Sequence, residues 1–149
     1  MSKDELKNNQ TRDSVQNFKA VCRRAGLRVT PQRVAVYEQI LGSKEHPSTS
    51  MVYEQVKRQF PEISLDTVNR TLRTIGELGL AKTIPGCGGA KRFDADLTGH
   101  QHFQCIKCGK IIDFTCPAFE NTNLPREIRE EFMVLTKTLY VQGICKKCR

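Results

Sequence analysis

Residues 64–94 read SLDTVNRTLRTIGELGLAKTIPGCGGAKRFD, in which a helix pattern gives way to a hairpin pattern. Ser64 is a favourable helix cap, apolar residues recur at helical spacing between Val68 and Ile75, and Gly79 is a favourable stop. Two short strand patterns follow, separated by the glycine-rich turn at residues 85–89. The stretch predicts a helix joined to a basic hairpin.

Three further helices are predicted upstream of this stretch. The first follows apolar residues spaced from Val15 to Ala25, and the second opens at Thr30-Pro31, where threonine caps and proline fits the first turn. The third begins after a cap at Ser48 and is closed by Pro61. Short helices followed by a basic hairpin predict a winged helix-turn-helix domain over residues 1–94.

Residues 95–149 have a different, strand-rich pattern. The expected elements are two short strands, a helical region that Pro125 kinks or splits, and a third strand, at residues 102–106, 110–114, 117–132 and 134–144. The whole chain is therefore predicted to be of the α+β class, with a winged helix first and a small α/β domain second.

Charge is spread unevenly over the 149 residues, whose formal net charge is +8. Residues 1–92 hold 16 Lys and Arg against 9 Asp and Glu, whereas residues 93–149 hold 8 against 7. A basic front half favours an anionic partner such as nucleic acid. A solvated, lysine-rich surface explains the same imbalance, so charge alone does not decide between them.

The chain shows no sign of a membrane or export signal. No apolar run approaches the eighteen residues of a membrane span, and the polar N-terminus lacks the apolar stretch of a signal peptide. We expect a cytoplasmic protein that makes no membrane contact. In such a reducing compartment, paired cysteines more often hold metal than form disulfides.

Four of the seven cysteines form two Cys-x-x-Cys pairs, Cys105/Cys108 and Cys145/Cys148. Each pair can turn both sulfurs towards one ion, and four thiolates are the tetrahedral set that zinc prefers. The spacing predicts a structural Zn²⁺ site, with a redox dithiol as the rival interpretation. Of the other cysteines, Cys22 is expected in the core, whereas Cys87 and Cys116 are assigned no role.

The histidines suggest a second metal site. His100 and His102 alternate along a predicted strand, Asp113 lies on the neighbouring strand, and Asp94 and His46 belong to the front part. These five side chains could meet at one ion that couples the two domains. Histidine pairs also occur on solvated strands, so spacing alone leaves both interpretations open.

Several strings of residues resemble the ferric uptake regulator family, and the resemblance runs from about Val15 to the C-terminus. The strings are Thr30-Pro31-Gln32-Arg33, His46-Pro47-Ser48, Ser64 to Leu72, His100 to Phe114, and the closing pair Cys145/Cys148. The resemblance implies a homodimeric, metal-dependent transcription factor that acts as a repressor. It also implies an N-terminal winged helix and, over residues 95–149, a dimerisation and metal-sensing domain.

Within that family the chain is most similar to the peroxide-responsive regulators. Their regulatory ligands fall on the two aspartates and three histidines named above, His46, Asp94, His100, His102 and Asp113. Asp113 is the discriminating residue, because iron-sensing members usually carry Glu there. The resemblance implies Fe²⁺ or Mn²⁺ at this site and peroxide sensing through oxidation of His46 and His100.

Double-stranded DNA, as an operator, is the expected partner. Side chains off the apolar stripe of the fourth helix can reach bases or phosphates, and basic residues of the hairpin and second helix can reach the backbone. A solvated polar face is the alternative. The family usually has Tyr at the position of Asn69, which leaves the operator sequence open. The candidate DNA-binding residues are Thr67, Asn69, Arg70, Arg73, Thr74, Lys82, Lys91, Arg92 and Arg33.

Three other functions fit parts of the pattern. A repressor of the same family could report iron or zinc levels without oxidation. A zinc-stapled protein-interaction module would not bind DNA, which the basic front half argues against. A metal-dependent hydrolase would use His100, His102 and Asp113, but no Glu is placed as its general base. We therefore expect a regulator that is not an enzyme and has no substrate beyond metal and peroxide.

Overall fold

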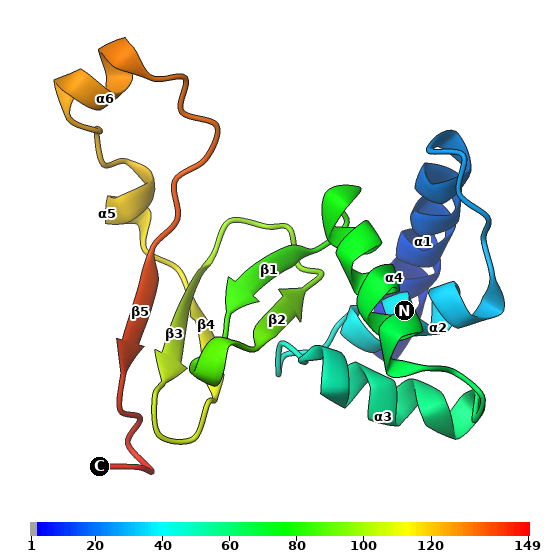
Figure 1. Ribbon diagram of the computed structural model, residues 1–149. Helices are drawn as coiled ribbons and strands as arrows, with labels where there is room; N and C mark the ends of the chain where they lie inside the picture. Colours follow the sequence, from blue (N-terminus) through cyan, green and yellow to red (C-terminus); the bar gives the residue numbers. More distant parts are fainter. Residues whose placement is uncertain (1–2) are drawn as a thin grey trace. The chain divides into compact units, whose positions relative to one another are not determined.

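The structure is a computed structural model that describes residues 3–149, except for the side chains of residues 3–8 and of Cys87. The chain divides into two compact units, the first ending at Leu97 and the second running from Thr98 to Arg149 (Figure 1). This division falls a few residues beyond the predicted boundary after Asp94. None of the described helices is long and apolar enough to cross a membrane.

Four helices make up most of the first unit, and their caps are the predicted ones. The side chains of Thr30, Ser48 and Ser64 accept hydrogen bonds from the backbone N–H groups of Arg33, Met51 and Thr67, which satisfies donors that a helix start leaves unpaired. The helices are α1 (Lys3–Arg24), α2 (Pro31–Ile40), α3 (Thr49–Gln59) and α4 (Leu65–Glu77).

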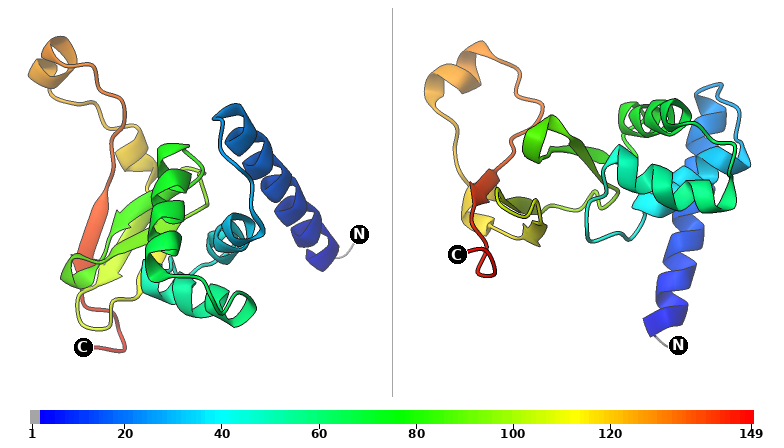
Figure 2. Two further views of the ribbon diagram at one scale, coloured as in Figure 1. Left: turned by 45° about the vertical axis from the view of Figure 1, so that its right-hand side comes forward. Right: turned by 60° about the horizontal axis from the view of Figure 1, so that its bottom comes forward.

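Helix α1 is longer than the apolar pattern predicted. It begins at Lys3, whereas its first buried apolar residue among those described is Val15. The N-terminal half extends beyond the other helices of the unit (Figure 2). Extending an existing helix fixes one residue for each added hydrogen bond and needs no new nucleus, so a polar segment can continue a helix whose other half is packed.

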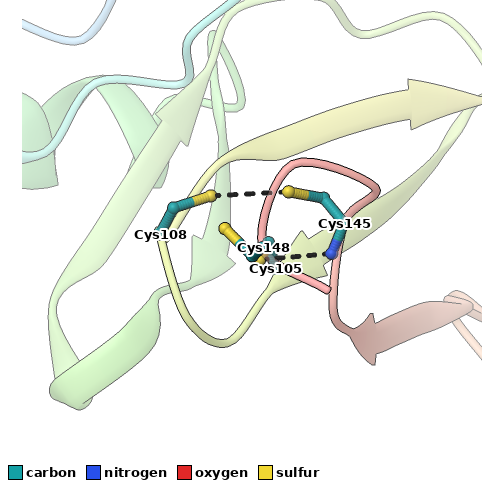
Figure 3. A group of neighbouring side chains, drawn as sticks. All are labelled: Cys105, Cys108, Cys145 and Cys148. Atoms are coloured by element: carbon teal, nitrogen blue, oxygen red, sulfur yellow. Dashed lines mark hydrogen bonds between the residues drawn. The ribbon is translucent and has the colours of Figure 1, made fainter.

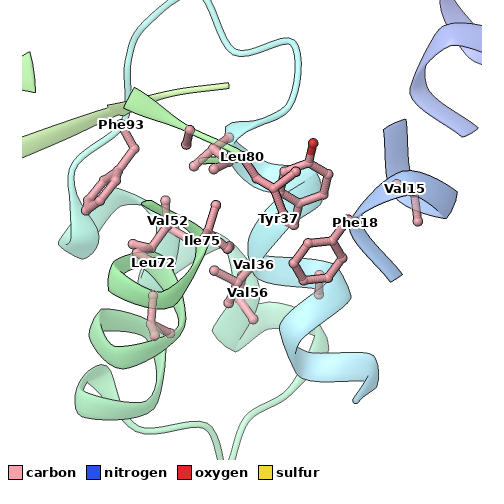
Figure 4. Close-up of a cluster of buried hydrophobic side chains, with 14 of the residues drawn as sticks. Val15, Phe18, Val36, Tyr37, Val52, Val56, Leu72, Ile75, Leu80 and Phe93 are labelled. Carbon is pink, nitrogen blue, oxygen red and sulfur yellow. The ribbon is translucent and has the colours of Figure 1, made fainter. Parts of the chain in front are cut away.

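The core of the first unit joins all four helices to the hairpin (Figure 4). Phe18 of α1 stacks on Tyr37 of α2, with ring centroids 4.5 Å apart. Val36 and Leu72 are completely buried, and Cys22 is buried with them, as the sequence predicted. The apolar stripe of α4 therefore faces inward and leaves its other face for solvent.

The hairpin after α4 has the predicted antiparallel form. Strands β1 (Lys82–Pro85) and β2 (Lys91–Asp94) pair with Lys82 opposite Asp94, and a short 3-10 turn, η1 (Cys87–Gly89), joins them. The turn closes tightly over Gly86, where a Cβ atom would lie 2.0 Å from the backbone oxygen of Ala90. Glycine is therefore required at this position.

A three-stranded sheet forms the second unit. Strands β3 (Gln101–Cys105) and β4 (Ile111–Phe114) are antiparallel, and β5 (Tyr140–Gly143) pairs with the other edge of β3 in parallel. The predicted helical region is split at Pro125 into α5 (Pro117–Glu120) and α6 (Arg126–Glu131). Both units together confirm the predicted α+β class.

The third strand of this sheet is shorter than predicted. Its sequence pattern began at Val134, but only Tyr140–Gly143 pairs with β3. Before it, Lys137 Nζ donates to the backbone oxygens of Phe119, Glu120 and Thr122 at the end of α5. A β-favourable sequence becomes a strand only where the edge of another strand is available. The segment before Tyr140 is instead hydrogen-bonded through Lys137 to the end of α5.

Candidate metal centres and nucleic-acid interface

The four paired cysteines come together at one end of the three-stranded sheet (Figure 3). Cys105 ends β3 and Cys108 follows in the turn to β4, while the parallel pairing of β5 with β3 places Gly143 beside Cys105 and brings Cys145 and Cys148 next to them. The four sulfur atoms lie within 4.8 Å of one another.

The geometry of the four sulfurs fits one zinc ion. Zn–S bonds of about 2.3 Å in a tetrahedron place the sulfurs about 3.8 Å apart, and Cys108 Sγ lies 3.9 Å from Cys145 Sγ. Lys107 Nζ also donates to the backbone oxygen of Cys148 at 2.9 Å, which joins the two Cys-x-x-Cys turns. The structure thus brings together all four predicted zinc ligands.

The pKa values of two of these thiols are shifted in opposite directions. The backbone N–H of Cys145, which lies 3.4 Å from the Cys105 sulfur, and then that of Cys108 lower the pKa of the Cys105 thiol to about 6. Hydrogen bonds with the sulfurs of Cys145 and Cys108 raise the pKa of Cys148 to about 12. Four thiols this close cannot all ionise by themselves, so a bound cation would displace their protons.

Two of the predicted regulatory histidines lie beside a carboxylate in the second unit. His102 is directly opposite Asp113 in the β3–β4 pairing, with His102 Nε2 3.6 Å from Asp113 Oδ1. His100 precedes the strand rather than lying within it, yet its Nε2 is 3.0 Å from His102 Nε2 and 4.0 Å from the same oxygen. Two imidazoles and one carboxylate therefore converge at one point.

His46 and Asp94 form a second pair, within the first unit. His46 Nε2 lies 3.7 Å from Asp94 Oδ2, and both side chains are buried. Asp94 ends β2, where its other oxygen accepts from the backbone N–H of Asp96 at 2.8 Å. The backbone of His46 is left-handed, with φ of 49°, a conformation uncommon for a residue with a side chain.

Nitrogen and carboxylate oxygen donors of this kind suit Fe²⁺ or Mn²⁺ better than four thiolates do. The two groups occur in different units of the chain, His46 with Asp94 and His100 and His102 with Asp113. Their union in a single site stays a prediction.

The candidate DNA-binding residues of α4 occupy its outer face. Asn69, Arg70 and Arg73 are exposed, and Thr67 and Thr74 are half-buried. The two arginines form ion pairs along the helix: Arg70 Nη2 lies 2.6 Å from Asp66 Oδ2, and Arg73 Nε lies 3.8 Å from Glu77 Oε1. The cationic groups thus face solvent but are partly balanced by neighbouring acids.

The four basic residues predicted outside α4 divide into two kinds. Lys82 and Lys91 are exposed on the hairpin. By contrast, Arg92 donates from Nε to the backbone oxygen of His46 and from Nη2 to that of Glu45, and Arg33 Nη1 donates to the backbone oxygen of Arg28 at 2.6 Å. DNA contact by any of the four stays a prediction, but the last two have structural roles that sequence patterns did not reveal.

Two remaining cysteines can be compared with expectation in part. Cys116 is half-buried at the start of α5, and its backbone N–H donates to Gln101 Oε1 at 2.7 Å. The side chain of Cys87 lies outside the described residues. The structure also buries Gln104 in β3, next to the Tyr140 hydroxyl, a contact that no sequence signal indicated.

Comparison with known proteins matches residues 24–142 to the ferric uptake regulator family. The peroxide-responsive repressor PerR of Staphylococcus epidermidis is 33% identical over 130 residues, which cover 87% of each chain. The ferric uptake regulator of Pseudomonas aeruginosa, solved with manganese, has a TM-score of 0.67 at 28% identity over 86% of this chain and 97% of that one. The Helicobacter pylori ferric uptake regulator Fur shares the fold, with a TM-score of 0.78 at 21% identity over 93% of both chains.

Proposed function

The chain belongs to the ferric uptake regulator family, and on this premise we propose that it is a repressor that senses peroxide through bound Fe²⁺ or Mn²⁺. Members of this family are metal-sensing transcriptional regulators and not enzymes, and they bind DNA and are dimeric. This chain is therefore a metal-sensing transcriptional regulator. The signal, the metals and the residues that hold them form the proposal.

Zn²⁺ is proposed as a permanent, structural ion held by Cys105, Cys108, Cys145 and Cys148. The support is the closeness of the four sulfurs, which lie within 4.8 Å of one another, and the chemistry of the donor set. A closed four-thiolate site has no open position and zinc has no redox chemistry, so this site would not sense anything itself. Its work is to hold the ends of β3 and β5 together.

The regulatory ion is proposed to take His46, Asp94, His100, His102 and Asp113 as ligands. The support is that these residues form two pre-arranged groups of nitrogen and carboxylate donors, one in each unit. Bound Fe²⁺ would supply one-electron chemistry with peroxide. The five residues would hold this ion, and His46 and His100 are the two side chains proposed to be oxidised.

Peroxide is favoured over metal level as the signal for two reasons. The residue opposite His102 is Asp113 and not Glu, which is the pattern of the peroxide-responsive regulators. The relatives that cover 87% of this chain are named peroxide-responsive repressors. Reporting of iron or zinc level without oxidation is the alternative within the family.

The single observation that carries the proposal is the convergence of His100 and His102 on Asp113 beside a separate thiolate site. The test loads the zinc-containing protein with Fe²⁺ or Mn²⁺ without oxygen and measures DNA affinity before and after one addition of peroxide. We expect loss of DNA binding and added oxygen on His46 and His100, by peptide mass spectrometry, in the Fe²⁺ sample only.

The control outcomes separate the alternatives. If DNA is released when metal is removed but neither histidine gains oxygen in the Fe²⁺ sample, the chain reports metal level and the peroxide proposal is wrong. If the metal-loaded protein shows no salt-dependent binding to duplex DNA, the protein-interaction module is favoured instead, because phosphate contacts release counterions and make DNA affinity fall with salt.

A further inference from the structure

We propose that Arg92 is a positioning residue for the regulatory ion: its guanidinium holds the turn that carries His46 against strand β2. The inference rests on the proposed function, because it assumes that His46 and Asp94 are ligands. It assigns to Arg92 a task different from the phosphate contact that its place in the hairpin suggested.

The Arg92 guanidinium donates hydrogen bonds to two consecutive backbone oxygens. Arg92 Nε donates to the oxygen of His46, and Nη2 donates to the oxygen of Glu45 at 2.8 Å. The planar fork of an arginine side chain can bind two acceptors at once in a fixed orientation, which the single ammonium of lysine cannot reproduce. The guanidinium therefore holds the turn at His46, which is the proposed ligand, and at Glu45, the residue before it.

The turn needs these hydrogen bonds because the backbone of His46 has an unfavourable conformation. Its φ is 49°, and among the described residues other than glycine it alone has a positive φ. A residue with a Cβ atom persists in this region only when its surroundings hold it there. Arg92 binds the carbonyl of that same residue, so its loss would let the turn relax and swing the imidazole away.

Backbone contacts of β2 also hold the turn that carries His46. Phe93 N–H donates to the oxygen of Pro47 at 3.0 Å, and Ser48, the cap of α3, forms a bridge with Arg92. Residues two apart on a strand point to the same face, so the side chains of Arg92 and Asp94 share a face. One strand thus orients both His46 and Asp94.

This arrangement links the ligand pair to the hairpin. The strand that carries Arg92 and Asp94 is also the return strand of the hairpin, and it pairs along its length with β1. Any displacement of His46 would be passed to β2 through the guanidinium. Lys91 offers a matched control, because it is the adjacent basic residue on the same strand and is exposed.

The test compares wild type, Arg92→Gln, Arg92→Lys and Lys91→Gln as full-length, zinc-loaded proteins. It measures Mn²⁺ affinity without oxygen, DNA affinity at low and at saturating Mn²⁺, and amide hydrogen exchange at Phe93 without Mn²⁺. Removal of residues that orient metal ligands weakens binding by about ten- to hundredfold. We expect a loss of Mn²⁺ affinity of that size in Arg92→Gln, a smaller loss in Arg92→Lys, and wild-type Mn²⁺ affinity in Lys91→Gln, which serves as a control for metal binding alone.

DNA binding separates the two roles of Arg92. A positioning residue predicts that saturating Mn²⁺ restores the DNA affinity of Arg92→Gln, and that Phe93 exchanges faster in this variant before Mn²⁺ is added. A phosphate contact predicts a DNA affinity that Mn²⁺ does not restore and a salt dependence reduced by about one ion. That result, or Mn²⁺ affinity within twofold of wild type, would overturn the inference.

Two further measurements keep the inference independent of folding and of the proposed function. If Arg92→Gln does not fold, Arg92→Lys carries the test alone, because it keeps the charge and loses the second acceptor contact. Wild type is compared with His46→Ala. If Mn²⁺ affinity does not depend on His46, the proposed regulatory site is wrong; if it depends on His46 but not on Arg92, only the positioning role is wrong.

Discussion

At the scale of single residues, the arginines of α4 combine exposure with pairing. Arg70 and Asp66 form an ion pair on the helix surface with each side chain about two-thirds exposed. Such pairs contribute about 0–1 kcal/mol to stability, so they can be opened at little cost. The guanidinium is therefore available to a base edge or phosphate while its local charge is balanced in the absence of DNA.

We predict that Arg70→Ala weakens operator binding by about 1–3 kcal/mol, the value of one good arginine contact with DNA. Fluorescence anisotropy with an operator selected in vitro, at two salt concentrations, measures this loss. The matched control is Arg126→Ala, which removes an arginine paired with Glu130 in the same i,i+4 arrangement in the second unit. Equal effects of the two substitutions would contradict a role of α4 in DNA recognition.

At the scale of secondary-structure elements, two glycines near the hairpin have opposite requirements. Gly76 lies in α4, where a Cβ atom would meet only Thr83 Oγ1, at an ordinary distance of 3.8 Å. Gly86 lies in the turn that closes β1 and β2, where a Cβ atom would overlap the backbone oxygen of Ala90. The same substitution should therefore stabilise one element and disrupt the other.

Gly76→Ala is expected to stabilise the first unit by about 0.5–1 kcal/mol, because alanine loses less conformational freedom in a helix than glycine does. Gly86→Ala should destabilise it by about 1–3 kcal/mol through overpacking and should weaken DNA binding as the hairpin opens. Denaturant unfolding of the zinc-loaded proteins measures both changes. A stable Gly86→Ala variant would show that the turn closes in another way.

At the scale of the whole molecule, the described residues of the second unit form a very small apolar core. Among its described residues, Cys105 and Ile111 are its only buried hydrophobic side chains. Several large apolar side chains are exposed instead, including Phe132, Met133 and Leu135. A unit this small usually needs a metal or a partner chain. Its composition thus agrees with the dimeric state of the family and with the proposed zinc.

We predict that Cys105→Ser abolishes zinc binding and unfolds residues 98–149, and with them the response to peroxide. Loss of one thiolate opens the tetrahedral set, and structural zinc contributes directly to folding. Zinc content and limited proteolysis measure the change, with Cys116→Ser, a half-buried cysteine of the same unit, as the control. A folded and responsive Cys105→Ser protein without zinc would remove the structural role of the site.

Long-range contacts explain most of the differences between prediction and structure. The shorter strand at Tyr140–Gly143 depends on which segment finds the edge of β3. The sequence predicted that His102 and Asp113 lie on neighbouring strands, because a short turn joins those strands, but it did not predict that the two residues are direct partners. The hydrogen bond from Arg92 to the backbone oxygen of His46 was not predictable, since the two residues are 46 positions apart and no local pattern relates them.

The sequence by itself determined the helices, the hairpin and the four cysteines that come together as the proposed zinc site, because caps, glycine stops and Cys-x-x-Cys spacing are local signals. It also pointed to the family through strings of adjacent residues. Only the tertiary structure decided that Arg92 and Arg33 bind backbone oxygens within the chain, and that His46 adopts a left-handed backbone. Those features depend on partners brought together by folding, and a guanidinium has the same appearance in a sequence whether it meets a phosphate or a carbonyl.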